Sequence, residues 1–504
     1  MSTELVESIF QLDDPNIITY NRMKTDYIRI APTTGSSDYA NQSGQINFEI
    51  NNQQYFLYLP EAFLHCEFDL FRKPAGGAEV RLEQKDNITL EHNFFPKLFT
   101  NMQIDVGSGT LETITNPGIY DDMIRFVKFN KSYTDRASHI QGWIPDTNDG
   151  KITKHFAGTT TAKKTIKQVK QGAATTNIAV NNADLIAENT DVANPTAVEE
   201  VYNHLKTGVG ANHGFSKRMR LYNRNGHFVS RWKLSPLFGY LDHKKISYQL
   251  KYVLRLTRST DNNPSVFFGD TDFTEEVIIR ISKIELWIPQ IQPSLTVEAY
   301  LNRRLASGNP IPITYMKRHT MSPISVVGDE YSFMIASGVT KTPRYAVVAF
   351  KTANNPSVYV NDALFFLQGR TRFRPATKDW DPASEVQIQQ IQLQLNNINY
   401  PNQPIMMKFD NQNDYSEAYT EYENMCYNFG VIPQLDPHDW YSLYPIFCFD
   451  CSSQNEDLKR GGITLRVNVK FNANPQGNLR AYALLFEDNL SHINVINGVM
   501  TNIE

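Results

Sequence analysis

The feature that most constrains the fold is a long alternation of apolar and polar residues. In the segment 246–257, ISYQLKYVLRLT, the even positions are apolar or tyrosine, and every odd position except Val253 is polar or charged. The segment 463–472, ITLRVNVKFN, repeats the pattern. Successive side chains of a strand point to opposite faces, so these runs predict strands with one buried face and one wet face.

Further strand-like segments recur along the chain, and turn signals separate them. Asn-Pro, Asn-Gly and Asn-Pro-Gly steps stand at 116–118, 225–226, 263–264, 355–356 and 474–477. Helical periodicity is limited to short stretches, at 120–126, 197–206, 296–306 and 415–422. Many strands separated by turns, with few helices, predict an all-β protein built from antiparallel sandwiches. The chain has 504 residues, which exceeds the roughly 250–300 residues of a single core, so we expect two such units.

The two halves of the sequence also resemble each other. Residues 102–126 read as strand, turn, strand, Asn-Pro-Gly and a short aromatic-acidic helix. Residues 391–422 read as strand, Asn-Asn turn, strand and a short acidic helix rich in tyrosine. This match of pattern, rather than of identity, predicts a duplicated module.

Charge, cysteine content and hydropathy exclude several classes of protein. The net charge of −4 argues against a chain built mainly to coat nucleic acid. No window approaches the ~18 apolar residues of a membrane span, and the acidic start lacks the features of a secretory signal. Four cysteines are too few for a disulfide framework at this length. We therefore expect a protein that is made inside a cell and is not secreted.

The segment 103–110, QIDVGSGT, resembles the start of a nucleotide or methyl-donor site. Such a site needs glycines that end a strand and open a helix, whose amides hold the ligand. Here a β-prone stretch and then Asn116-Pro117-Gly118, which we expect to break a helix, follow the glycines. A hairpin turn is the favoured interpretation, with a counterpart at Asn396-Asn397, and we predict no cofactor.

No other motif predicts catalysis or metal binding. Cys448 and Cys451 could form half of a zinc site, but only Cys426 and His438 lie near them in sequence, and the setting YPIFCFDC is typical of a strand end. Buried or half-buried thiols are the favoured interpretation. The histidines are dispersed, with no HExxH motif, and no GxSxG elbow or Walker loop occurs. We expect no catalytic residue, no metal and no enzyme activity.

A basic segment is the one candidate for a binding surface. Residues 211–258 hold eleven Lys and Arg against one acid, Asp242. A solvated sheet face is one interpretation, and a surface that faces phosphates or an acidic partner subunit is the other. The residues predicted to face a partner subunit or a genome are Lys217, Arg218, Arg220 and Arg224.

In order and spacing, the motifs resemble those of a known family over nearly the full length. The matching segments are 8–12 (SIFQL), 93–106 (NFFPKLFTNMQIDV), 278–289 (IIRISKIELWIP), 293–300 (PSLTVEAY), 391–409, 414–422, 448–450, 462–471 and 479–489. The chain resembles the double jelly-roll major capsid proteins of Polinton/Maverick elements, adintoviruses and virophages.

This resemblance implies two consecutive eight-stranded antiparallel jelly-roll sandwiches with a few short helices. It further implies a homotrimer that forms a pseudo-hexameric capsomer and tiles an icosahedral shell around a double-stranded DNA genome. Penton and minor capsid proteins, non-specific contact with the packaged DNA and a location in the virion follow as expectations. We expect an N-terminal arm at 1–43, a first roll at 44–292 with an exposed insertion at about 151–210, a connector at 293–312 and a second roll at 313–504.

Two other functions remain open at this point. A β-sandwich that binds a receptor or a carbohydrate would have the same strand pattern. A methyltransferase built on the glycine loop is the enzyme alternative.

Overall fold

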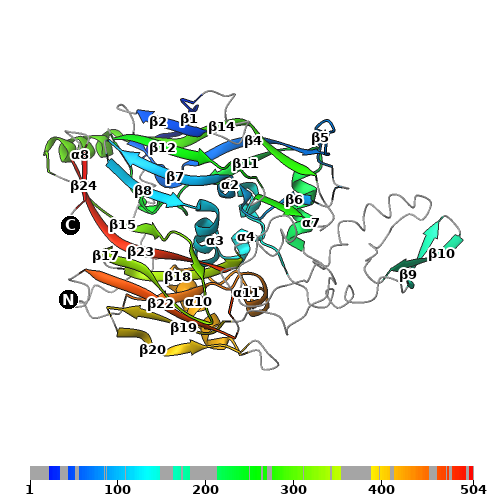
Figure 1. Ribbon diagram of the computed structural model, residues 1–504. Helices are drawn as coiled ribbons and strands as arrows, with labels where there is room; N and C mark the ends of the chain where they lie inside the picture. Colours follow the sequence, from blue (N-terminus) through cyan, green and yellow to red (C-terminus); the bar gives the residue numbers. More distant parts are fainter. Residues whose placement is uncertain are drawn as a thin grey trace, which may run out of the picture.

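We describe the fold from a computed structural model (Figure 1). The structure describes residues 22–34, 44–51, 56–83, 86, 88–107, 109–147, 163–171, 174–181, 213–248, 250–262, 265–268, 275–309, 311–340, 343–352, 388–396, 398–408, 414–452, 462–472, 474–475, 479–494 and 499–502.

The first half of the chain forms a sandwich of two four-stranded sheets. The first sheet has the order β1 (Arg22–Ile30), β14 (Glu276–Pro293), β4 (Phe63–Lys73) and β11 (His227–Lys233). The second has the order β2 (Gln45–Asn51), β12 (Lys251–Arg258), β7 (Phe99–Val106) and β8 (Gly109–Thr115). Every neighbouring pair is antiparallel.

The second half repeats this arrangement. One sheet has the order β15 (Ile311–Thr320), β23 (Leu479–Asn494), β18 (Pro343–Thr352) and β21 (Phe447–Asp450), and the other has β17 (Glu330–Thr340), β22 (Ile463–Phe471), β19 (Ile388–Leu395) and β20 (Ile398–Met406). Counted along the chain within each roll, both halves have the order first-eighth-third-sixth in one sheet and second-seventh-fourth-fifth in the other. The predicted duplication and the predicted double jelly roll are confirmed.

Shorter strands extend or flank these sheets. β3 (Phe56–Leu57) pairs with β14, β5 (Val80–Arg81) with β4, and β16 (Ile324–Val326) and β24 (Val499–Asn502) with β23, while β6 (Ile88–Leu90) pairs with β13 (Val266–Phe268). β9 (Lys163–Gln171) and β10 (Ala174–Asn181) form a separate hairpin within the predicted insertion, drawn apart from the two rolls in Figure 1.

The helices are short, and most of them follow one strand and precede the next along the chain within a single roll. They are η2 (Leu59–Glu61), α2 (Phe94–Lys97), α3 (Pro117–Lys128), α4 (Lys131–Thr134), η3 (Ala137–Gln141), α7 (His213–Tyr222), η4 (Tyr240–Asp242), α8 (Leu295–Ala306), α10 (Ser416–Asn428) and α11 (Pro437–Leu443). Among the described residues, no helix is both long and apolar enough to cross a membrane.

The alternation that predicted strands also predicts which of their side chains are buried in the core. In β12, Tyr252, Leu254 and Leu256 are buried, as predicted, although the strand begins at Lys251 rather than at residue 246. In β22 the apolar positions 463, 465, 467, 469 and 471 are all buried. The buried apolar residues of both rolls form one continuous cluster.

The glycine loop is a hairpin turn, as predicted. Gly107 has a φ of +59° between β7 and β8, and Asn396 has a φ of +46° between β19 and β20. Both sit in the left-handed region, which glycine and asparagine tolerate best. In both rolls the hairpin joins the fourth strand to the fifth.

The expectation that Asn116-Pro117-Gly118 breaks a helix was wrong. Pro117 is the first residue of α3, where the missing proline N–H would have no partner in any case and the fixed φ suits a helix. The predicted helix at 120–126 is therefore longer, running from 117 to 128. The predicted helix at 296–306 is α8, whereas that at 197–206 lies outside the described residues.

The segment predicted as an N-terminal arm contributes a strand to the first roll. Residues 22–30 form β1, which pairs with β14 along its length from Arg22 to Ile30. Residues 1–21 lie outside the described part of the chain. α8 follows β14 within the segment predicted as a connector, and β15 begins at Ile311.

Candidate functional site

The four predicted basic residues lie on α7 and directly after it, but they do not share one environment. Lys217, Arg220 and Arg224 are exposed. Arg218 is fully buried, so the prediction that it faces a partner or a genome is wrong. For the other three residues, a partner-facing role stays a prediction.

Arg218 is instead a structural ion-pair residue inside the first roll. Its Nη2 lies 2.7 Å from Asp146 Oδ1, and its Nε and Nη1 donate to the carbonyl oxygens of Leu90 and Ile144 at 2.8 and 2.6 Å. These contacts tie α7 to β6 and to the loop that contains Asp146. A buried guanidinium needs such partners because an unpaired buried charge is costly.

Arg218 belongs to a larger set of buried charges in the first roll. Its members are all at most 7% exposed: Glu91, His92, Lys97, Asp121, Asp122, Arg125, Asp146 and Arg218. We call this set the buried charge cluster. His92 Nε2 lies 3.2 Å from Asp122 Oδ2, Lys97 Nζ lies 2.9 Å from the same oxygen, and Arg125 Nε lies 2.6 Å from Asp121 Oδ2. Each acid thus has a cation beside it.

The buried charge cluster also joins the two rolls. Tyr444, of the second roll, accepts a hydrogen bond from the Asp146 N–H and donates one to Asp146 Oδ2, both at 3.1 Å. Gln434, also of the second roll, donates to the Arg125 carbonyl at 2.6 Å and accepts from Trp143 Nε1 at 3.1 Å. Sequence reasoning missed this cluster, because nothing in a single sequence distinguishes these charges from solvated ones.

Three members of the cluster stand close enough to ligate a metal ion. One ligand atom each from Glu91, His92 and Asp146 lie within 4.8 Å of one another. However, Lys97 Nζ is 3.6 Å from Glu91 Oε1, and the Arg218 guanidinium is paired with Asp146. These two fixed positive charges already compensate the acids and would repel a divalent cation, so the chemistry of this set favours an ion-pair network over a metal site.

The cluster predicts a pH-dependent stability. Burial, the largest influence, and the charge of Lys97 lower the pKa of His92, but Asp122 and Glu91 outweigh them and leave the pKa raised above 6.5. Protonated His92 therefore stabilises the fold fully below pH 6.5, and this contribution is lost as the pH rises through the raised value. Urea unfolding between pH 6 and pH 8 should show stability falling with pH in the wild type. The decline should be smaller in His92→Asn, and identical slopes in both proteins would contradict the prediction.

A second contact zone joins the rolls at β8 and β15; we call it the junction. Glu112 of β8, 1% exposed, accepts from the Arg318 N–H at 2.8 Å and from the Tyr240 N–H at 3.0 Å. The Arg318 guanidinium lies 3.4 Å from Asp242 Oδ2 and stacks 5.0 Å from the Phe486 ring centroid. The hydroxyl of Tyr120, on α3, donates to the Met321 carbonyl just beyond β15. The fifth strand of the first roll thus contacts the first strand of the second roll, and the helix that follows it contacts the residue directly after that strand.

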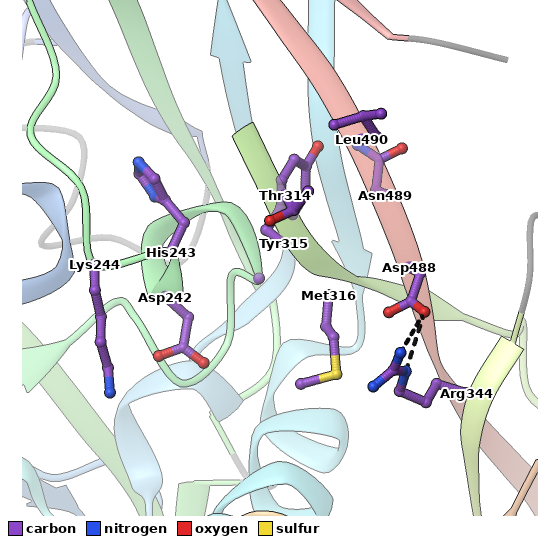
Figure 2. A pocket seen from close by; sticks show the side chains of 11 residues that line it. Asp242, His243, Lys244, Thr314, Tyr315, Met316, Arg344, Asp488, Asn489 and Leu490 are labelled. Carbon is purple, nitrogen blue, oxygen red and sulfur yellow. Dashed lines mark hydrogen bonds and ion pairs between the residues drawn. The ribbon is translucent and has the colours of Figure 1, made fainter. Parts of the chain in front are cut away.

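A cavity of about 630 Å³ lies beside the junction (Figure 2). Asp242, His243 and Lys244 line it from the first roll, and Thr314, Met316 and residues 488–490 line it from the second. Arg344 points toward Asp488 and pairs with it at 2.9 Å. Acidic and basic side chains are balanced, so this cavity has no charge preference for a ligand.

The cysteines are buried thiols, as predicted. Cys66, Cys426, Cys448 and Cys451 are all free and buried. Burial raises the pKa of Cys66 and Cys448 well above the usual value. Such thiols are poor nucleophiles and poor metal ligands.

Sequence comparison assigns the fold to a family. The profile of the double jelly roll-like domain matches residues 203–491, more than half of the chain. The chain belongs to this double jelly roll-like family. The match spans the end of the first roll and nearly all of the second. No curated protein matches the sequence.

Solved structures of similar fold come from viruses. A chain of the Sputnik virophage, determined by cryo-EM, is 12% identical with a TM-score of 0.53, over 100% of this chain and 93% of that one. The Faustovirus major capsid protein is 10% identical with a TM-score of 0.48, over 95% and 92%. The mavirus major capsid protein is 11% identical with a TM-score of 0.47, over 95% and 90%. The likeness to the Sputnik chain, with a TM-score above 0.5, shows that the two chains share a fold.

Proposed function

We propose that this chain is the major structural protein of a viral capsid and that it acts by assembly rather than by catalysis. The observation that carries the proposal is the pair of rolls with identical strand order in one chain of the double jelly roll-like family. The full-length likeness to a chain of a virophage particle supports the same role.

In this proposal three copies form a trimer whose six rolls make a pseudo-hexameric capsomer. Because the two rolls share one topology, three chains supply six similar units, and such units can surround a common axis. Capsomers would then tile an icosahedral shell around a double-stranded DNA genome, with penton and minor capsid proteins as partners. The protein would reside in the virion.

The predicted parts of the chain take their roles from this arrangement. The segment 1–43 would contribute β1 and an arm, the insertion at about 151–210 would lie on the outside of the capsomer, and 293–312 would connect the rolls. Lys217, Arg220 and Arg224 remain the proposed contacts to packaged DNA or to an acidic partner, since they are exposed on and beside one helix. Salt-dependent binding of duplex DNA, weakened when these three are replaced by Gln, would support that contact.

The oligomeric state of the purified full chain tests the main proposal. Light scattering coupled to gel filtration should give three times the 57.7 kDa mass of the chain, and negative-stain images should show hexagonal tiles or shells. A stable monomer that binds glycans on an array would overturn the proposal in favour of a receptor- or carbohydrate-binding sandwich.

A further inference from the structure

Helix α8, in the segment between the two rolls, has no buried residue. Val297, Leu301 and Leu305 form its more covered side but are only half-buried, and none of them is among the described side chains that pack against the core cluster. Figure 1 shows the helix at the left edge of the molecule, beyond the strands of the first roll. A helix of twelve residues is marginal in water unless a packed apolar face stabilises it. The described residues therefore do not supply the packing that α8 needs.

Exposed apolar side chains are concentrated at this helix. Five large apolar residues of the described chain are at least 60% exposed, and three of them are Leu295 and Tyr300 of α8 and Met23 of β1, at 77%, 68% and 64%. Met23 lies near the helix because β1 pairs Arg22 with Pro293, two residues before α8 begins. We call Met23 and the exposed side of α8 the connector surface. Apolar patches of this kind mark interaction sites.

The connector surface also has an excess of positive charge. Residues 22–26 and 294–306 hold four cations against two acids: Arg22, Lys24, Arg303 and Arg304 against Asp26 and Glu298. Lys24 pairs with Asp26 at 3.1 Å, so the excess comes from the arginines. An apolar surface with excess positive charge fits a partner that carries both apolar side chains and carboxylates.

The segment directly before β1 has this composition. Residues 1–21 contain Glu4, Glu7, Asp13 and Asp14 and no lysine or arginine. Apolar or aromatic residues occupy positions 5, 6, 9, 10, 12, 17, 18 and 20. The segment joins the described chain at Arg22, and therefore beside the start of α8. A covalently attached segment acts at an effective concentration of roughly millimolar, which gives it an advantage over a partner that is free in solution.

We propose that residues 1–21 dock on the connector surface of their own chain, with their apolar side chains against α8 and Met23 and their carboxylates beside the arginines. The docking supplies the packed face that α8 lacks and removes its exposed apolar side chains from water. It takes place within one chain, so it goes beyond the proposed capsid assembly and does not depend on it.

Cross-linking within the full chain tests this docking. Ala299 is exposed on α8, and the four native thiols are buried, so a short bis-maleimide should react at introduced cysteines alone. Ser8→Cys/Ala299→Cys should give an internally linked monomer, identified by the masses of the protein and of its peptides. The matched control, Ser8→Cys/Ala75→Cys, should give none. Ala75 is also exposed but follows Lys73, which pairs with Glu276 at the end of β14 that lies away from α8.

The cross-linking outcomes identify what covers α8. Equal linkage with Ala75→Cys, or no linkage with Ala299→Cys, would overturn the docking. Linked dimers from a mixture of Ser8→Cys chains and Ala299→Cys chains, without internally linked monomers in the double variant, would overturn the assignment to the same chain in favour of a second copy. A monomeric wild type whose double variant links internally would contradict the proposed assembly and leave the docking intact.

Hydrogen exchange gives a second readout of the docking. The amides of α8 should be protected in the wild type, because the docked segment stabilises the helix. Ile9→Asp/Phe10→Asp places two charges among the apolar side chains and should speed the exchange of α8 roughly tenfold or more, without a change in β12. Ser8→Asp/Gln11→Asp adds the same charges at polar positions and should leave the exchange of α8 within about twofold. Unprotected amides in wild-type α8, or equal effects of the two double variants, would contradict the docking.

Discussion

Replacing Arg218 with methionine is expected to lower the free energy of unfolding by about 3–5 kcal/mol. The side chain is fully buried, and its guanidinium is the cation that pairs with Asp146 at 2.7 Å. Methionine fills most of the same volume but removes that cation from the carboxylate and the guanidinium donors from two carbonyl oxygens. The loss is large because the nearest cation of a buried carboxylate is removed in a medium of low polarity. Urea denaturation followed by tryptophan fluorescence measures it.

The same helix provides a matched control. Arg220 stands two residues later and is exposed, so Arg220→Met should change the free energy of unfolding by no more than about 0.5 kcal/mol. Arg218→Met/Asp146→Asn should be more stable than Arg218→Met alone, because the second change removes the buried charge that has lost its arginine partner. Equal effects of Arg218→Met and Arg220→Met would show that the buried pair does not stabilise the fold.

The contrast between Arg218 and Arg220 also shows which features cannot be predicted from the sequence alone. Period-two alternation determines which residues of a strand face inward, so β12 and β22 and the two hairpins could be predicted. Arg218 and Arg220 look alike in sequence, because a basic residue in a polar helix has no local sign of burial. Their difference arises from β6 and the loop at Asp146, which only tertiary packing brings to α7.

The junction could not be predicted from the sequence for a related reason. Glu112 and Arg318 are 206 positions apart, and neither strand has a sequence feature that marks it as a contact between the rolls. The sequence does predict that the halves are duplicated, and duplication implies similar surfaces on both rolls. Which surface is covered within the chain, and which is left open, depends on how the connector places one roll against the other.

The second large effect is expected at Gly239, where the two rolls approach most closely among the glycines that the structure describes. A β-carbon at this position would lie 1.8 Å from the Met316 carbonyl oxygen and 2.8 Å from its carbon. Both are backbone atoms of β15, so no side-chain rotation can relieve the clash. Gly239→Ala should therefore separate β15 from η4 and cost about 3 kcal/mol or more.

Hydrogen exchange together with urea unfolding distinguishes this effect from a general loss of stability. In Gly239→Ala, amides of β8 and β15 should exchange faster, the Arg318 N–H that donates to Glu112 among them, while those of β12 and β22 keep most of their protection. Gly109→Ala is the control, since its β-carbon would lie 3.9 Å from the Val106 carbonyl oxygen, an ordinary contact. Unchanged exchange at β15 in Gly239→Ala would mean that the rolls are not held in close contact there.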